Sequence, residues 1–304
     1  MKLAVLALDY DGTITRDDRP DPSVLSAIAN ARRRNVTVIL VTGRILHDLR
    51  RAGDLNFVDC VVAENGALIH FPGTGHTTIL APLIPQAFVA RLEELGIAFR
   101  AGQCLVDGDA SSAHQLLNVI RELELPIVLS FNRSRVMALA QGVSKATGLG
   151  AALEIIRASP RNTVAIGDAE NDHELLRFSE VGAAVEWGSR SLQAAADLVI
   201  TGNGPPAVGD FIRRVAASRR LPTPVRARTR LLIGRTEDDR EFSLAVRGRN
   251  VLIVGETNSG KSWLAGLLCE RLILHGYSLC VIDPEGDYRT LDALPGVTVL
   301  GGEE

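Results

Sequence analysis

This chain of 304 residues has few aromatic residues, histidines and cysteines. It therefore lacks the usual sequence features of secreted disulfide-rich proteins, base-stacking surfaces and zinc sites. Aromatic residues make up only 4% of it, too few for a surface that stacks on bases. The six histidines show no metal-ligand spacing, and no GxSxG nucleophile motif is present. The four cysteines form no CxxC pair and lack the density of a disulfide scaffold, which fits a reducing cytoplasm. We therefore expect a cytoplasmic protein.

Membrane and nucleic-acid signals are equally weak. The apolar run at residues 3–8 is short and is followed at once by Asp9 and Asp11, unlike a signal peptide or a membrane-spanning helix. A net charge of −3 with mixed signs gives no overall field that would attract nucleic acid. Lysine is also rare, since Lys2, Lys145 and Lys261 are the only ones. Two of these three lysines fall in motifs described below.

Length and periodicity predict an α/β protein of two domains. The chain is long for a single domain. Its opening, with apolar runs at 3–8 and 36–41 around a helical pattern, predicts a β-α-β unit and hence a parallel sheet. Residues 83–140 change to α-β-β patterns that predict a small α+β lid, after which α/β alternation resumes. Residues 216–229 contain two prolines and repeated arginine, which is typical of a linker.

Polar residues that could carry chemistry follow the apolar strands. Asp9 and Asp11 stand two residues apart where the first predicted strand ends, and in open α/β sheets ligands bind at that edge. Taken alone, such a pair fits a solvated acidic turn equally well. Three further motifs follow in order, namely VTGR at 41–44, the lysine of GVSKATGL, and GDAENDHELL beginning at Gly167. Each residue singly could be a cap or a surface group, but together they favour a catalytic site.

These motifs resemble those of the haloacid dehalogenase superfamily phosphatases, in particular the Cof-like branch with a class IIB cap. The resemblance covers residues 1–215 and includes the ENGA segment at 64–67. It implies a Rossmann-like core at 1–82 and 141–215, with residues 83–140 as the α+β cap over the site. It also implies a magnesium-dependent phosphatase.

The resemblance assigns roles to individual residues. Asp9 would be the nucleophile and Asp11 the general acid and base, with Thr42 and Lys145 stabilising the phosphoryl group. Two carboxylates beside a phosphate need a cation, and Mg²⁺ would be held by Asp9, Asp11 (through its carbonyl), Asp168 and Asp172. The residues expected to bind substrate are Gly43, Arg44, Asn65 and Asn171.

The cap is expected to choose the substrate. Its short length favours a small phosphate monoester, such as a sugar phosphate or a phosphoglycolate-like acid. Arg100, Arg133 and Arg135 are candidates to bind a carboxylate or second phosphate, although the sequence favours solvated surface positions for them. One departure from the family pattern occurs at 187–189, where Trp-Gly-Ser replaces the usual GNA-type turn.

A second motif lies near the C-terminus. Residues 255–262 follow the phosphate-binding pattern GxxxxGKS between a predicted strand at 250–254 and a predicted helix at 263–275. In that pattern backbone N–H groups bind phosphates, Lys261 binds the β/γ oxygens and Ser262 binds magnesium. The residues expected to bind ATP are Gly255, Gly260, Lys261 and Ser262.

Residues 230–304 resemble HerA/FtsK-type motor ATPases, through this loop, the IGR at 233–235 and the acidic segment after a second predicted strand at 278–282. We expect an incomplete P-loop domain with a partial β-α-β unit, which is either a fragment of a longer protein or a remnant. Asp283 would belong to the nucleotide site or cap a loop. Two alternatives to a phosphatase stay open: a regulatory domain that binds a phosphorylated ligand within an ATPase machine, and a phosphomutase. The expected partners are a small phosphorylated metabolite and a nucleotide; nucleic acid is not expected.

Overall fold

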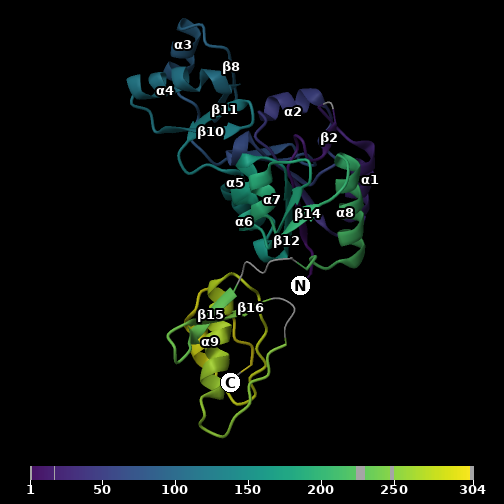
Figure 1. The fold of residues 1–304 in the computed structure, drawn as a ribbon, viewed down its shortest axis with the longest axis vertical. Helices are drawn as coiled ribbons and strands as arrows, with labels where there is room; N and C mark the ends of the chain where they lie inside the picture. Colours follow the sequence, from purple (N-terminus) through teal and green to yellow (C-terminus); the bar gives the residue numbers. More distant parts are fainter. Residues whose placement is uncertain (1, 17, 224–229, 247–249, 302–304) are drawn as a thin grey trace. The chain divides into compact units, whose positions relative to one another are not determined.

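The computed structural model describes residues 2–16, 18–223, 230–246 and 250–301. The chain divides into two compact units, Met1–Pro224 and Val225–Glu304, and each is described by itself (Figure 1). Among the residues that the structure describes, none of the helices has the length and hydropathy needed to cross a membrane.

An eight-stranded sheet forms the centre of the first unit, in the order β14-β13-β12-β1-β4-β5-β6-β7. The strands from β14 to β5 are parallel, and β6 and β7 extend the sheet antiparallel. The strands are β1 (Val5–Leu8), β4 (Thr37–Val41), β5 (Cys60–Ala63), β6 (Leu68–Phe71), β7 (His76–Ile79), β12 (Thr163–Gly167), β13 (Val181–Val185) and β14 (Leu198–Ile200).

Helices cover both faces of this sheet. Leu6 and Leu8 of β1 pack with residues of α1 (Pro22–Arg33), α2 (Leu46–Ala52) and α8 (Pro205–Ser218). The alternate residues Val5 and Ala7 pack on the other face with α5 (Lys145–Ile155), α6 (His173–Phe178) and α7 (Arg190–Ala195). Because successive side chains of a strand point to opposite faces, a strand that is buried on both sides is apolar throughout.

The cap is a four-stranded antiparallel sheet with two helices, and it has a hydrophobic core of its own. The sheet order is β10-β11-β9-β8. Phe88 and Leu92 of one helix and Leu116 of the other pack against Val106 and Val136 of the sheet. In Figure 1 the cap elements are grouped together, apart from the core helices α1 and α8. The elements are α3 (Gln86–Glu94), β8 (Phe99–Ala101), β9 (Leu105–Asp109), α4 (Ala113–Glu122), β10 (Ile127–Asn132) and β11 (Arg135–Ala140).

Several short elements differ from the sequence expectation. The small hairpin of β2 (Thr15–Arg16) and β3 (Arg19–Pro20) was not predicted, and neither were α2 and α7. Within the predicted α-β-β region, residues 99–109 form two strands, because residues 102–104 turn between β8 and β9. The predicted linker at 216–229 begins inside α8, which continues to Ser218, and its residues 224–229 lie outside the described residues.

The second unit contains a hairpin, a helix and a short 3-10 turn. The hairpin pairs β15 (Arg230–Arg235) with β16 (Glu241–Ala245), and the helix is α9 (Lys261–Leu274). The structure assigns no strand to residues 250–254 or 278–282, which the sequence predicted on either side of this helix. Leu252 and Ile282 are 87% and 89% exposed. A strand needs a paired neighbour for its backbone groups, and no described segment pairs with these two.

Candidate active site

Three neighbouring parallel strands bring the predicted catalytic residues to one edge of the core sheet. β1 lies between β4 and β12, and it is followed by Asp9, while Thr42 follows β4 and Asp168 follows β12. The Asp9 N–H donates to the carbonyl of Ile166 at 2.9 Å, which fixes the end of β1 against its neighbour. The carboxyl ends of parallel strands are where open α/β sheets bind ligands.

Asp9, Asp168 and Asp172 form a buried cluster of carboxylates. Each offers one oxygen such that the three oxygens lie within 4.8 Å of one another, and the residues are at most 3% exposed. Asp172 lies in the 3-10 turn Glu170–Asp172 that precedes α6. Its Oδ2 accepts the N–H groups of Asp168 and Ala169 at 2.9 and 3.1 Å, so it holds the loop that carries Asp168.

Lys145 links two of these carboxylates. Its Nζ lies 2.6 Å from Asp9 Oδ1 and 2.6 Å from Asp172 Oδ1, and the side chain is 1% exposed. Burial lowers the pKa of Lys145, but the carboxylates of Asp172 and Asp9 raise it by more, so the pKa lies above its ordinary value. The lysine is therefore charged.

The start of α5 positions Lys145. Ser144 caps the helix in a reciprocal capping box with Thr147. Two glycines let this helix approach the ENGA turn, since a Cβ on Gly148 would lie 2.5 Å from the Cα of Gly66. Any side chain at Gly148 would push the helix, and Lys145 with it, away from the carboxylates.

The carboxylate cluster fits a divalent cation. Asp9 Oδ2 is buried and has no hydrogen-bond partner among the described residues. Burial raises the pKa of Asp9 well above its ordinary value, Asp172 and Asp168 raise it further, and Lys145 opposes them. Burial and Asp172 likewise raise the pKa of Asp168 to about 6. Bringing these carboxylates together is unfavourable without more positive charge, and carboxylate oxygens are the ligands that Mg²⁺ prefers.

Asp11 lies beside the cluster, held by an arginine. Arg44 Nη2 is 2.5 Å from Asp11 Oδ1, its Nε also donates to the same carboxylate, and it contacts Asp18 as well. Gly12 follows with φ +73°, and a Cβ there would lie 2.3 Å from Asp168 Oδ2. Only glycine fits this close approach.

The Trp-Gly-Ser segment at 187–189, which departs from the family pattern, contacts the loop that carries Asp11 and Gly12. Trp187 Nε1 donates to the carbonyl of Gly12 at 2.7 Å. The N–H of Ser189 donates to the carbonyl of Asp168 at 2.7 Å, with Gly188 packed on the Asp168 backbone. The segment therefore supports both loops that carry the candidate catalytic carboxylates.

The other predicted site residues lie around this centre. Thr42 is buried, and its Oγ1 accepts the N–H of Arg44 at 3.1 Å. Asn171 Nδ2 donates to Asn65 Oδ1 at 3.4 Å, and Asn171 Oδ1 is buried without a partner among the described residues. Gly43 lines the pocket described next.

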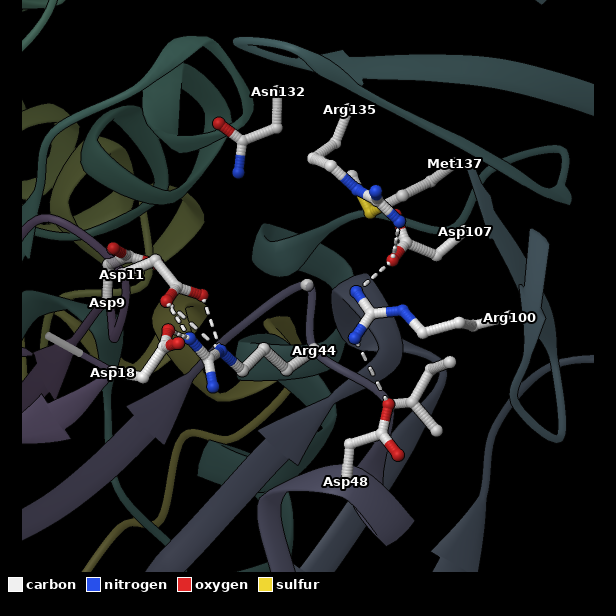
Figure 2. Close-up of a pocket in the computed structure, with 12 residues that line it drawn as sticks. Asp9, Asp11, Asp18, Arg44, Asp48, Arg100, Asp107, Asn132, Arg135 and Met137 are labelled. Carbon is white, nitrogen blue, oxygen red and sulfur yellow. Dashed lines mark hydrogen bonds and ion pairs between the residues drawn. The ribbon is translucent and has the colours of Figure 1, made fainter. Parts of the chain in front are cut away.

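A pocket of about 340 Å³ opens between these residues and the cap (Figure 2). Four of the polar residues that line this pocket were not predicted from the sequence. They are Asp18 and Asp48 of the core and Asp107 and Asn132 of the cap. No local motif marks them, since Asp107 stands in a cap strand of sequence LVDGD that has no apolar run for it to interrupt. The lining residues are Asp9, Asp11, Asp18, Gly43, Arg44, Ile45, Asp48, Arg100, Asp107, Asn132, Arg135 and Met137.

The second unit brings together part of its predicted phosphate loop. Helix α9 begins at Lys261, directly after Gly260, whose φ is +87°. Lys261 Nζ donates to the carbonyl of Glu256 at 2.5 Å, and Ser262 Oγ donates to Asp287 at 2.9 Å.

Gly255 and Asp283 lie in the same region of the second unit. A Cβ on Gly255 would lie 2.5 Å from Ser259 Oγ, so the loop is closely folded there. The carboxylate of Asp283 accepts the N–H groups of residues 286–288, which makes it a loop cap here.

Comparison with known proteins gives matches to both parts of the chain. Residues 6–111 and 92–212 match the family model of the haloacid dehalogenase-like hydrolases, which together is more than half of the chain. Residues 233–302 match the model of the central domain of the helicase HerA.

Individual relatives agree with the first match. A phosphoglycolate phosphatase of Natronomonas pharaonis is 30% identical over 218 residues, covering 65% of this chain and 91% of the relative. One of Methanosarcina acetivorans is 28% identical over 207 residues, covering 66% and 90%. A solved haloacid dehalogenase-like hydrolase from Bacteroides thetaiotaomicron superposes with a TM-score of 0.61 at 18% identity, over 70% of this chain and all of that one. A solved subclass IIB sugar phosphatase superposes with a TM-score of 0.56 at 19% identity, over 71% and 98%.

Proposed function

We propose that this phosphatase, which belongs to the haloacid dehalogenase-like hydrolase family, hydrolyses a small phosphate monoester through an aspartyl-phosphate on Asp9. One observation carries this proposal. Asp9 lines the pocket with a carboxylate whose Oδ1 is held by Lys145 and whose Oδ2 has no partner among the described residues. An oriented carboxylate that keeps one oxygen free of protein partners, in a residue that lines the pocket, is what nucleophilic attack on phosphorus requires.

The reaction divides into two displacements. In the first, an Asp9 oxygen forms a bond to phosphorus, the ester oxygen leaves, and Asp11 gives that oxygen a proton. In the second, Asp11 takes a proton from water, the water oxygen bonds to phosphorus, and Asp9 is released with inorganic phosphate. Arg44 orients Asp11 for both steps.

Positive charge is needed where the phosphate lies. Mg²⁺, when bound, would supply charge that offsets the repulsion between carboxylates and phosphate. The residues that would hold it are Asp9, Asp168 and Asp172, with the carbonyl of Asp11. Lys145 adds a fixed charge, and Thr42 is placed at the same sheet edge to donate to a phosphoryl oxygen.

The pocket supports a small substrate. Its volume of about 340 Å³ is at the lower end of the range for ligand sites. Relatives named as phosphoglycolate phosphatases make phosphoglycolate the first ester to test, and the sugar phosphatase neighbour makes sugar phosphates the second.

The test is release of inorganic phosphate from a panel of small esters, with and without Mg²⁺. We expect magnesium-dependent turnover that Asp9→Asn abolishes, while Asp210→Asn, an exposed aspartate on α8, keeps it. A folded protein that hydrolyses no ester but still binds one would contradict the proposal and favour a regulatory phosphate-binding domain.

For the second unit we propose nucleotide binding at residues 255–262. The support is the match to the HerA central domain and the placement of Lys261 and Ser262 at the start of α9. Titration with a fluorescent ATP analogue should show binding that Lys261→Ala removes without affecting phosphatase activity. Equal binding by both proteins would contradict this assignment.

A further inference from the structure

The ENGA segment at 64–67 forms a strained turn directly after β5. Glu64, Asn65 and Gly66 make a single 3-10 turn, and their φ values are +51°, +57° and +108°. Left-handed backbone is unfavourable for residues other than glycine, and a long side chain such as glutamate rarely adopts it. Such strain persists only where surrounding contacts impose it, and it is concentrated at functional sites. The contacts of this turn therefore indicate its role.

The carboxylate of Glu64 binds the cap. The residue is 1% exposed, its Oε2 accepts the N–H of Cys104 at 2.8 Å, and its Oε1 accepts the N–H of Gln103 at 3.2 Å. These two donors lie in the turn that joins β8 to β9. Burial raises the pKa of this carboxyl group, and the N–H groups of Cys104, Gln103 and Leu46 oppose that rise. Two of the three donors that stabilise this buried carboxylate therefore come from the cap.

The cap turn fits closely on the carboxylate. A Cβ on Gly102 would lie 2.6 Å from Glu64 Cδ, so any other residue at 102 would push the turn away. The same turn is bound to residues 80–85, which connect β7 to α3 and lead the chain into the cap. Within this connection the N–H of Ile84 donates to the carbonyl of Gln103 at 2.8 Å. Glu64 therefore holds the cap close to one of its connections to the core.

The backbone of the strained turn binds the core loop that carries predicted site residues. The N–H of Glu64 donates to the carbonyl of Arg44 at 3.0 Å, and the N–H of Asn65 donates to the carbonyl of Thr42 at 3.0 Å. Arg44 in turn holds the carboxylate of Asp11. One turn therefore joins the cap, through a side chain, to the core loop at 42–44, through its backbone.

The position of the cap turn affects the cap side of the pocket. The turn follows β8, which carries Arg100, a residue that lines the pocket. Leu105, directly after the turn, belongs to a small apolar cluster with Ile45 of the core and Met137 of the cap, and these two also line the pocket. Glu64 is not among the described residues that line it. Any effect of Glu64 on a substrate must therefore pass through its neighbours.

We propose that Glu64 positions the cap over the candidate active site, by holding the β8–β9 turn against the loop that carries Thr42 and Arg44. This inference rests on the proposed function, in which the cap covers the reacting phosphoryl group. Glu64 is a positioning residue, because it acts through the turn. Without this contact the cap should occupy its closed position in a smaller fraction of molecules.

A role in the stability of the core alone predicts something different. Asp197 offers a matched control, since it is 3% exposed and its Oδ2 accepts the N–H of Gly182 on β13, within the core sheet. Asp197→Asn should weaken the core without changing the contact between core and cap. If Glu64 only stabilised the core, Glu64→Gln should behave in the same way.

The first measurement is amide hydrogen exchange, which needs no turnover. In Glu64→Gln, which keeps the size of the side chain, the amides of Gln103 and Cys104 should exchange about 10- to 100-fold faster than in the parent protein, as for loss of a hydrogen bond to a charged group. Asp197→Asn should leave the exchange of these two amides unchanged. Unchanged exchange in Glu64→Gln would overturn the inference.

Gly102→Ala tests the same contact from the cap side. The added Cβ would displace the turn from the carboxylate, so exchange at residues 103 and 104 should accelerate as it does in Glu64→Gln. Because both changes break one contact, the double variant should differ little from either single variant. Effects that add in full would show that Glu64 does not act through this turn.

Turnover separates this inference from the proposed function. With phosphoglycolate and Mg²⁺, kcat of Glu64→Gln should fall by about 10-fold, while KM should change less because core residues would bind the phosphoryl group. An unchanged kcat beside faster exchange would mean that the contact holds the turn without positioning the cap for reaction, and the inference would be wrong. If the parent protein hydrolyses no ester in a broad panel, the phosphatase assignment fails, and the exchange rates alone decide whether Glu64 holds the cap.

Discussion

The guanidinium of Arg133, at the tip of the β10–β11 hairpin of the cap, contacts the carboxylate of Asp168 in the core. Arg133 is 55% exposed at its side chain, whereas Asp168 is almost completely buried. The backbone N–H of Arg133 also donates to the side chain of Glu170, two residues after Asp168 in the same core loop. The cap tip therefore contacts a residue that would hold the metal. The Arg133 guanidinium and the metal ion would compete for the Asp168 carboxylate.

Arg133→Ala should bind divalent cations several-fold more tightly than the parent protein. The guanidinium must leave Asp168 when a metal binds there, so its removal eliminates a competing ion pair. Calorimetric titration with Mg²⁺ or Mn²⁺, without substrate, measures the change. Arg91→Ala controls for the loss of one positive charge from the cap, and an unchanged affinity in Arg133→Ala would mean that the contact does not oppose the metal.

Lys145→Met should destabilise the first unit by about 3–5 kcal/mol in the presence of a chelator. The substitution leaves the buried carboxylates of Asp9 and Asp172 without their shared cation. Mg²⁺ should restore part of that stability, because it supplies charge to the same carboxylates, but not activity. Urea denaturation with and without Mg²⁺ measures both effects, and Lys2→Met, at an exposed position, is the control. Equal stability of Lys145→Met and the parent protein in chelator would contradict the prediction.

Trp187→Phe should lower kcat/KM for phosphate esters while it costs only about 1 kcal/mol of stability. Phenylalanine keeps the ring packing but removes the Nε1 hydrogen bond to the Gly12 carbonyl, which steadies the loop between Asp11 and Thr13. Steady-state kinetics and thermal denaturation of the same samples separate the two effects. Full activity in the variant would show that the loop holds its position without this bond.

His70 should contribute a loss of stability as the pH drops below its ordinary pKa of 6.5. Burial and the nearby Arg50 guanidinium lower the pKa of His70 from its ordinary 6.5, so in acid the unfolded state binds more protons than the folded state. His70→Gln should therefore flatten the decline of the urea midpoint between neutral pH and the lowered pKa. His76→Gln, at an exposed position of the same hairpin, should leave that decline unchanged. Identical pH profiles for the parent protein and His70→Gln would contradict the contribution of His70.

The sequence predicted the family and the α/β architecture, and both are confirmed. The reason is that the parallel strands are buried on both faces and therefore appear as unbroken apolar runs, such as Val5–Leu8. The polar residues that follow these runs could be placed at one sheet edge without a structure. The roles assigned to them stay predictions.

The rest depends on contacts between distant segments. Arg100, Arg133 and Arg135 were favoured as surface cations, and only the fold brings Asp107 and Asp168 to them. The ion pair of Arg44 with Asp11 joins residues 33 positions apart, and no spacing rule predicts such a pair. In the second unit the periodicity at 250–254 is that of a strand, but a strand forms only where a neighbour pairs with it.

The role of Asp9 as nucleophile is tested by locating the phosphoryl group in a rapidly quenched reaction with phosphoglycolate and Mg²⁺. Asp11→Asn should slow hydrolysis of the intermediate, so that mass spectrometry of peptides finds one phosphoryl group on Asp9. A phosphoryl group on another residue, or turnover that persists in Asp9→Asn, would contradict the assignment of Asp9 as the nucleophile.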